Sequence, residues 1–178
     1  MKWDFTMTQH IFLTGKKHIG KSTLIQKILD DYKKTADGFL TVRTKDYLKN
    51  QYSVHMYHLK EKEFPNESNL LFLCGKTDEH TADTFDRLGC NILSMCSDCS
   101  LIVMDELGPH EADAALFRKK ILNLLDGQTP ILGVLQESAE SFWPEIVNHP
   151  KVEIITISED NRNDRALLNY IQCKISSP

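Results

Sequence analysis

A glycine-containing stretch near the N-terminus has the residue types and spacing of a phosphate-binding loop. It runs from Gly15 to Ser22 and matches the pattern G-x-x-x-x-G-K-[ST] at every fixed position. Glycines let the backbone fold closely around phosphate oxygens, so that successive amide groups point inward. The predicted nucleotide-binding residues are this loop and the residue that follows it: Gly15, Lys16, Lys17, His18, Ile19, Gly20, Lys21, Ser22 and Thr23.

Two side chains of this loop carry specific chemistry. The Lys21 ammonium is a flexible point charge suited to the β- and γ-phosphates of a triphosphate, so we expect it to act in catalysis as well as binding. The Ser22 hydroxyl suits an oxygen shell around Mg²⁺, which is therefore the predicted cofactor. A second Gly-Lys-Thr, at 75–77, fails the pattern because Leu70 stands five residues before its glycine.

An acidic pair follows a strongly apolar run later in the chain. Residues 101–104 (LIVM) are typical of a central strand, and Asp105 and Glu106 come directly after them. Ligands of parallel sheets gather outside the carboxyl ends of the strands, where the phosphate loop also lies. Asp105 is therefore predicted to hold Mg²⁺, and Glu106 to orient and deprotonate an attacking water. A simple GTPase is expected to carry an NKxD motif that reads the nucleotide base, and none is obvious here. The Asp-Glu pair favours an ATPase-like hydrolytic site.

The pattern of apolar residues predicts the elements that must position these groups. Short apolar strands alternate with amphipathic helices, which indicates an α/β fold with a mainly parallel sheet and helices on both faces. No repeat or linker divides the chain, so residues 1–178 are predicted to form a single domain. The expected strands are 10–14, 38–43, 51–59, 70–74, 101–104, 131–135 and 151–157, and 61–69 is expected to loop out. The expected helices are 21–33, 84–96, 111–126 and 163–175, together with a short one that follows residues 138–141 and ends at residue 148.

Composition and charge exclude several classes of protein. The 178 residues include 21 Lys and Arg against 25 Asp and Glu, which gives a formal net charge of -4 and a pI near 6.0. A negative overall field argues against general binding to nucleic acids or anionic membranes, because both require cations to neutralise phosphates. No run approaches the roughly 20 apolar residues that span a bilayer, so no membrane partner is expected.

The cysteines indicate a reducing compartment. There are five, and an odd number without a secretory signal predicts reduced thiols and a cytoplasmic location. Cys96 and Cys99 have the spacing of a redox pair or of half a zinc site, but a second half-site is missing. The favoured interpretation is that they are small buried apolar residues.

The segment from Asp105 to Glu111 (DELGPHE) resembles the D-E-[IL]-G-x-x-E signature of the cancer-related nucleoside-triphosphatase family, which are small P-loop enzymes. Other segments follow in the order of that family: the phosphate loop first, then the Gly38-Phe39 pair, and finally a block at 157–163 that is similar to its E-N-R segment. The similarity covers most of the chain, although residues 44–82 match poorly.

This resemblance implies a three-layer, RecA-like P-loop NTPase fold with some antiparallel additions to the sheet. It also implies Mg²⁺-dependent hydrolysis of nucleoside triphosphates to diphosphates, with broad tolerance of the base. Lys21, Ser22, Asp105 and Glu106 keep the roles given above. By the resemblance, Glu111 is an additional acid near the site, and Arg162 contacts the base or a phosphate.

Three positions depart from the family pattern. His18 stands where a glycine is usual, Pro109 stands where a lysine is usual, and residues 42–43 replace an expected acidic pair. The histidine adds bulk to the loop, and the proline removes a cation that could face a phosphate. These departures are expected to affect turnover more than nucleotide binding.

Two other functions fit the same motifs. A small-molecule kinase also joins a phosphate loop to a small sheet, but it needs an acceptor pocket and a lid, for which 47–69 is the only candidate region. A nucleotide-gated interaction module would bind a nucleoside triphosphate and scarcely hydrolyse it. In each case the expected partner is ATP, GTP or another nucleoside triphosphate.

Overall fold

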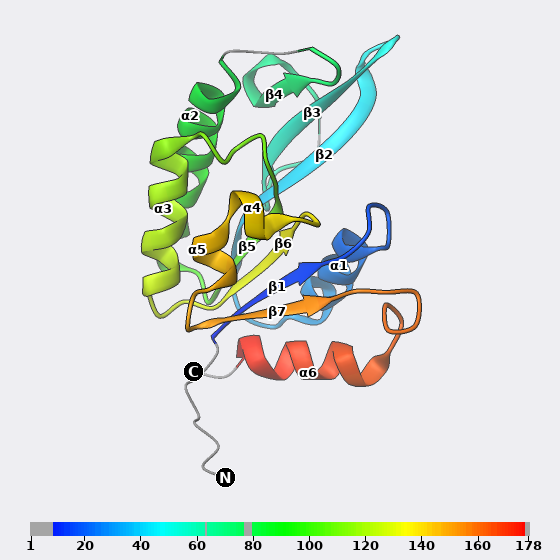
Figure 1. Cartoon of the computed structure of the whole chain (residues 1–178), viewed down its shortest axis with the longest axis vertical. Helices are drawn as coiled ribbons and strands as arrows, with labels where there is room; N and C mark the ends of the chain where they lie inside the picture. Colours follow the sequence, from blue (N-terminus) through cyan, green and yellow to red (C-terminus); the bar gives the residue numbers. More distant parts are fainter. Residues whose placement is uncertain (1–8, 63, 77–79, 177–178) are drawn as a thin grey trace.

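One seven-stranded sheet organises the part of the chain that the structure, a computed structural model, describes: residues 9–62, 64–76 and 80–176. The strand order is β4-β3-β2-β5-β6-β1-β7 (Figure 1). β2, β5, β6, β1 and β7 are parallel, whereas β3 and β4 extend the sheet in antiparallel fashion. The strands are β1 (His10–Thr14), β2 (Ala36–Leu48), β3 (Gln51–His58), β4 (Leu70–Leu73), β5 (Leu101–Leu107), β6 (Ile131–Leu135) and β7 (Val152–Thr156).

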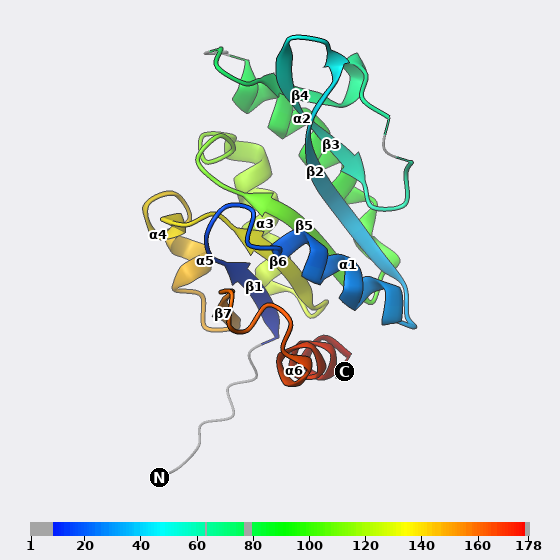
Figure 2. The same cartoon turned by 90° about the vertical axis from the view of Figure 1, so that its right-hand side faces the viewer.

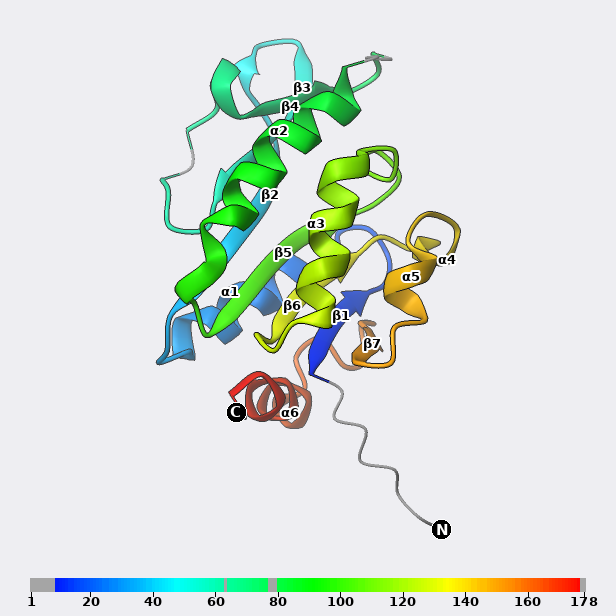
Figure 3. The same cartoon turned by 90° about the vertical axis from the view of Figure 1, so that its left-hand side faces the viewer.

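Helices cover both faces of this sheet. Figure 2 shows α1 (Lys21–Asp31) on one side, with α6 (Arg165–Ser176) below it. The opposite view shows α2 (Thr81–Ser94) and α3 (Ala115–Asp126) in front of the other face (Figure 3). The mainly parallel, three-layer arrangement with antiparallel additions is confirmed. Every helix in the described ranges is too short or too polar to cross a bilayer.

Alternation along β1 divides the core into two apolar clusters. Phe12 faces the α2 and α3 side together with Phe117, whereas Ile11 and Leu13 face the α1 and α6 side together with Ile25. All five of these side chains are at most 1% exposed. Successive side chains of a strand point to opposite faces, so a continuous apolar run is required where both faces are covered. The sheet is therefore held rigidly beneath the loops that follow β1, β5 and β6.

Several predicted boundaries differ from the structure, each for a physical reason. α3 begins at Ala115 instead of residue 111, because the Glu111 carboxylate turns inward and accepts a hydrogen bond from the Gly108 backbone N–H. In place of the one short helix expected after residues 138–141, there are two, α4 (Ala139–Phe142) and α5 (Pro144–Val147). The break falls before Pro144, which has no backbone N–H with which to continue a helix.

Smaller corrections concern strand lengths and two short 3-10 helices. β2 is longer than expected, and β5 continues past Met104 to Leu107, so that the acidic pair lies within the last residues of the strand. Part of the expected 61–69 loop is the 3-10 helix η1 (Glu67–Asn69), and η2 (Cys96–Asp98) follows α2. Gly127 ends α3 with a φ of -69°, so it is not the left-handed cap that glycine often supplies there.

Candidate functional site

The phosphate loop and the acidic pair lie at one edge of the sheet. β1 and β5 are each parallel to β6, which lies between them, so the three carboxyl ends face the same way. The loop after β1 and the acids at the end of β5 are thus one strand apart. This edge is where open α/β sheets bind their ligands.

The backbone of the phosphate loop requires glycine at both fixed positions. Gly15 has a φ of 132° and Gly20 a φ of 107°, both in the region that favours glycine. A Cβ on Gly15 would also collide with the carbonyl oxygen of Ile157. α1 starts directly after Gly20 without a side-chain cap, so its first N–H groups and its positive dipole end remain available to an anion.

Lys21 is held across this loop. Its side chain is buried, and its Nζ donates hydrogen bonds to the carbonyl oxygens of Gly15 at 2.7 Å and Lys16 at 3.0 Å. Both bonds fix the ammonium at the centre of the loop. A phosphate in the loop would therefore meet a cation that is already positioned, in addition to the backbone N–H groups.

Ser22 and Asp105 connect the loop to the end of β5. The Ser22 hydroxyl donates to Asp105 Oδ1 at 3.2 Å, and the aspartate is only 4% exposed. Burial raises the pKa of Asp105 to about 6; the charge of Glu106 adds to this, while the Ser22 hydrogen bond and the Lys21 charge oppose it. Within the described residues Asp105 forms no salt bridge. Hydroxyl and carboxylate oxygens are the donors that Mg²⁺ prefers, so this pair fits the ion.

The two glutamates of the signature have different environments. Glu106 is half-buried and lines the cavity beside the phosphate loop. Glu111 is 4% exposed and accepts a hydrogen bond from the Gly108 backbone N–H. Burial raises the pKa of Glu111 to about 7, although its backbone hydrogen bonds oppose the shift. Both glutamates line the cavity, but Glu106 is the more exposed of the two, whereas Glu111 also holds the 108–111 turn in place.

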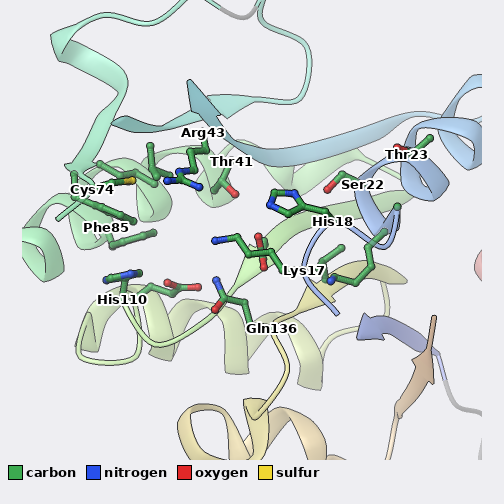
Figure 4. Close-up of a pocket in the computed structure, with 18 of the residues that line it drawn as sticks. Lys17, His18, Ser22, Thr23, Thr41, Arg43, Cys74, Phe85, His110 and Gln136 are labelled. Carbon is green, nitrogen blue, oxygen red and sulfur yellow. The ribbon is translucent and has the colours of Figure 1, made fainter. Parts of the chain in front are cut away.

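A cavity of about 640 Å³ extends from the phosphate loop past Glu106 (Figure 4). This is the size of a small-molecule site. Lys17 and His18 border it on one side, and Phe85 and His110 lie across from them. The rest of the wall includes residues of β2, β3, β4 and β6 and of the segments that follow β4, β5 and β6: Thr41, Arg43, Val54, Leu71, Phe72, Cys74, Gly75, Glu111, Val134 and Gln136.

Gln136 is a cavity residue that sequence reasoning missed. It directly follows β6, the strand between β1 and β5, and its backbone N–H donates to the Leu107 carbonyl oxygen at 2.9 Å. Its side chain packs so closely that a Cβ on Gly108 would lie 2.6 Å from it. A signal was present in the sequence, because Gln136 is the first polar residue after the apolar run 131–135.

Arg43, Phe72 and His110 were missed for a different reason. They come from β2, β4 and the turn after β5, and the rings of Phe72 and His110 meet with centroids 4.4 Å apart. No local spacing links these positions. Only the sheet order brings them to one cavity.

Arg162 lies outside the main cavity. It lines a second hollow of about 220 Å³ on the other side of the phosphate loop, together with Ile19, Lys27 and Asn163. His18 and Thr23 border both hollows. The structure therefore brings Arg162 to the loop, but away from the acidic pair. Pro109 lines neither hollow.

The fold and the phosphate loop define the class of this protein, which has a P-loop NTPase fold. A family model described as NTPase matches residues 10–171, and the chain belongs to that family. The resemblance inferred from the DELGPHE segment is thereby confirmed.

Two relatives agree with this family assignment, and two solved structures agree with the fold. The nucleoside-triphosphatase THEP1 of Thermotoga maritima is 27% identical over 170 residues, which cover 90% of this chain and 92% of the relative. The human cancer-related nucleoside-triphosphatase is 27% identical over 191 residues, covering 96% and 99%. The fold is similar to the crystal structure of THEP1 from Aquifex aeolicus, with a TM-score of 0.74, 19% identity and coverage of 94% and 99%. The solution structure of the human protein gives a TM-score of 0.64, 24% identity and coverage of 96% and 99%.

Proposed function

We propose that this chain hydrolyses nucleoside triphosphates to diphosphates and phosphate with the help of Mg²⁺. The observation that carries the proposal is the 3.2 Å contact between Ser22 and Asp105, which joins the phosphate loop to the acidic pair. The names of the relatives, nucleoside-triphosphatase THEP1 and cancer-related nucleoside-triphosphatase, support the same reaction.

Ser22 and Asp105 would hold the magnesium ion. Bound there, Mg²⁺ would offset negative charge on the phosphate oxygens and favour the departure of the diphosphate. The buried Asp105 carboxylate lacks a cationic side-chain partner in the described part of the chain, and an external cation would supply one.

The remaining groups bind the triphosphate and move the proton. Loop amides, the α1 N-terminus and Lys21 hold the phosphates in a fixed orientation, so little reorganisation is needed as charge develops. Glu106, facing the cavity, accepts a proton from the water that attacks the γ-phosphorus. The Gln136 carboxamide faces the same space and can hydrogen-bond to that water or to a γ-phosphate oxygen.

Broad base tolerance fits the second hollow. A site that reads one base needs rigid, enclosed polar groups, because discrimination comes from leaving them unpaired with the wrong base. This hollow of about 220 Å³ instead offers long cationic side chains, Lys27 and Arg162, beside the first turn of α1. Both side chains are exposed. We place the base here, and propose that Arg162 contacts the base or the α-phosphate without selecting among bases.

The direct test is phosphate release from ATP, GTP, CTP and UTP, with the nucleotide product identified by chromatography. Wild type should release phosphate and diphosphate from all four. Glu106→Gln keeps one hydrogen-bonding oxygen but loses the base, so kcat should fall by about 10²–10⁴ while nucleotide binding remains. Glu140→Gln, at an exposed position in α4, is the matched control and should be unchanged. Wild-type turnover no higher than that of Glu106→Gln would refute hydrolysis.

A kinase remains a second candidate because of the shape of the main cavity. Hydrolysis needs room for one water beside Glu106, yet the space continues to an apolar wall of Val54, Leu71 and Phe72. Val54 belongs to the 47–69 segment named as the acceptor region. If a nucleoside or nucleoside monophosphate speeds diphosphate formation without matching free phosphate, the kinase is favoured. Tight Mg²⁺-dependent binding with negligible turnover would instead indicate an interaction module.

A further inference from the structure

Cys96 and Cys99 form a contacting pair at the edge of the sheet opposite the phosphate loop. Cys96 is the first residue of η2, and Cys99 is its C-terminal cap, two residues before β5 begins at Leu101. In a 3-10 helix the side chains at i and i+3 lie above one another. The Cys99 Sγ donates to the Cys96 carbonyl oxygen at 3.2 Å, and the Cys96 Sγ donates to the Ile92 carbonyl oxygen at 3.5 Å. A turn of this kind keeps the two Cα atoms within about 7 Å, which is the range of a disulfide.

The two thiols have unequal roles in this contact. Cys96 is 4% exposed and packs in the apolar cluster, whereas Cys99 is half-buried. The neighbouring Cys96 side chain lowers the pKa of Cys99 to about 7; burial and the Asp37 charge oppose this shift, and the backbone N–H groups of Leu101 and Cys99 add to it. The Cys99 side chain, burial and the Asp37 charge raise the pKa of Cys96. Cys99, whose sulfur is the more accessible and has the lower pKa, is therefore the better nucleophile, and the Cys96 sulfur is buried beside it.

The surroundings favour redox chemistry over metal binding. Within the described residues no three His, Cys, Asp or Glu side chains are grouped to hold a metal ion, which argues against the half-zinc-site interpretation. The titratable groups near the pair are Tyr32, the C-terminal cap of α1, Asp37 in β2 and Lys60, which follows β3; His58, the last residue of β3, contacts Asp37. Cys90, from α2, is a neighbour in the same apolar cluster. The Asp37 charge opposes both thiolates, the Lys60 charge offsets part of this at Cys96, and the close Cys96 side chain favours the Cys99 thiolate.

We propose that Cys96 and Cys99 form a thiol–disulfide exchange site, in which Cys99 attacks a small-molecule disulfide and Cys96 resolves the product. With glutathione disulfide, the Cys99 thiolate bonds to one sulfur and displaces a glutathione thiolate, which takes up a proton. Cys96 then loses its proton to solvent and attacks the Cys99 sulfur, displacing the second glutathione. Two protein thiols are oxidised and one disulfide is reduced to two thiols. The inference is independent of nucleotide hydrolysis.

The first test exposes the full chain to glutathione disulfide and maps its peptides by mass spectrometry. Wild type should lose two hydrogen atoms from the peptide that carries Cys96 and Cys99. Cys96→Ser should stop at one glutathione on Cys99, and Cys99→Ser should give neither product at this site. Cys173→Ser removes an exposed thiol elsewhere and should behave as wild type. A wild-type Cys96–Cys99 peptide that stays reduced while Cys173 is modified would overturn the proposal.

The second test separates the thiol pair from a merely structural turn. The alkylation rate of Cys99 is followed against pH, with the modified residue located by mass spectrometry. Its midpoint in wild type should lie near pH 7. Cys96→Ser keeps a hydroxyl donor and should retain a low midpoint, whereas Cys96→Ala should move it toward the ordinary value of about 8.5. Equal midpoints in wild type and Cys96→Ala would show that the pair does not activate Cys99.

Discussion

Two aspartates on neighbouring strands have the same exposure and opposite electrostatic environments. Asp37 lies near the start of β2 and Asp105 near the end of β5, and each is 4% exposed. The two strands pair in parallel, so the aspartates lie at opposite edges of the sheet. Burial alone would raise both pKa values. The difference between them comes from their partners.

The protein neutralises Asp37 with its own groups. His58 Nε2 lies 2.6 Å and Lys60 Nζ 2.7 Å from its two carboxylate oxygens, and the Gly38 N–H donates to it at 2.8 Å. Burial raises the pKa of Asp37, but these hydrogen bonds and charges together lower it. Asp105 has a hydroxyl partner in Ser22, and its pKa is raised. A buried acid that is ion-paired with side chains of the protein, as Asp37 is, stabilises the fold. A buried acid that forms no salt bridge within the described residues, such as Asp105, suits an external cation.

The largest expected effect is on hydrolysis in Asp105→Asn. Loss of the carboxylate should lower phosphate release by about 10³-fold, because metal stabilisation of transferring phosphates is worth several kcal/mol. The free energy of unfolding should stay equal or rise, since asparagine still accepts from Ser22 and carries no buried charge. Phosphate release and urea unfolding measure the two effects. Full activity in this variant would remove Asp105 from the site.

A pH-dependent effect on stability should come from His10, a buried group satisfied by the backbone. Its Nε2 lies 2.9 Å from the Leu125 carbonyl oxygen, and the Ile131 N–H donates to its Nδ1 at 3.1 Å, so the ring must be neutral with its proton on Nε2. Burial lowers the pKa of His10 from 6.5 to about 4; the charges of His149 and Lys151 add to this, and the Leu125 hydrogen bond opposes it.

The sign of this effect follows from proton uptake. Between pH 6.5 and about 4 the unfolded chain binds a proton at His10 that the folded chain does not. The buried neutral His10 ring therefore contributes its full stabilisation above pH 6.5. As the pH falls from 6.5 to about 4, the free energy of unfolding decreases by up to about 3 kcal/mol. Urea unfolding at several pH values measures it, and His10→Gln should lose this part of the slope. Parallel curves for variant and wild type would contradict the assignment.

Asp37→Asn should reduce stability and spare activity, which is the reverse of Asp105→Asn. The variant loses the charge that holds His58 and Lys60, so the free energy of unfolding should fall by about 1–3 kcal/mol. Lys60 is more than half exposed and can be solvated again, which limits the loss. Thermal unfolding and phosphate release are the readouts. A large fall in hydrolysis by the folded variant would break the distinction between the two acids.

The smallest effect is expected for His18→Gly. His18 has a φ of 63°, a left-handed conformation that costs an ordinary residue about 1–2 kcal/mol and a glycine almost nothing. Glycine also loses more entropy on folding, by about 0.5–1 kcal/mol. The net gain in unfolding free energy should therefore be below about 1 kcal/mol, as measured by urea unfolding. A loss larger than that would indicate that the imidazole makes stabilising contacts.

The sequence could predict features that depend on local spacing. The 10–14 strand, the glycine positions of the loop and the place of the Asp105-Glu106 pair follow from short patterns with one physical solution. Gln136 was within reach of the same reasoning. Phe72 and His110 were not, because strand order alone brings them together.

Two other differences have tertiary causes. The inward turn of Glu111 delays the start of α3, although periodicity favours a helix from residue 111. The contact between Cys96 and Cys99 depends on a 3-10 turn that spacing alone does not specify. The roles assigned to Lys21 and Arg162 stay predictions, as does that of Glu106, which the Glu106→Gln variant addresses.

The most direct test of the central claim is a magnesium titration of phosphate release, run against excess EDTA at fixed ATP. Because Asp105 is buried without a cationic partner in the described residues, we predict that wild type and Asp37→Asn require Mg²⁺ with similar half-saturation. Asp105→Asn should need far more Mg²⁺ for any residual turnover. Phosphate release that persists in EDTA, or an unchanged magnesium requirement in Asp105→Asn, would contradict the account.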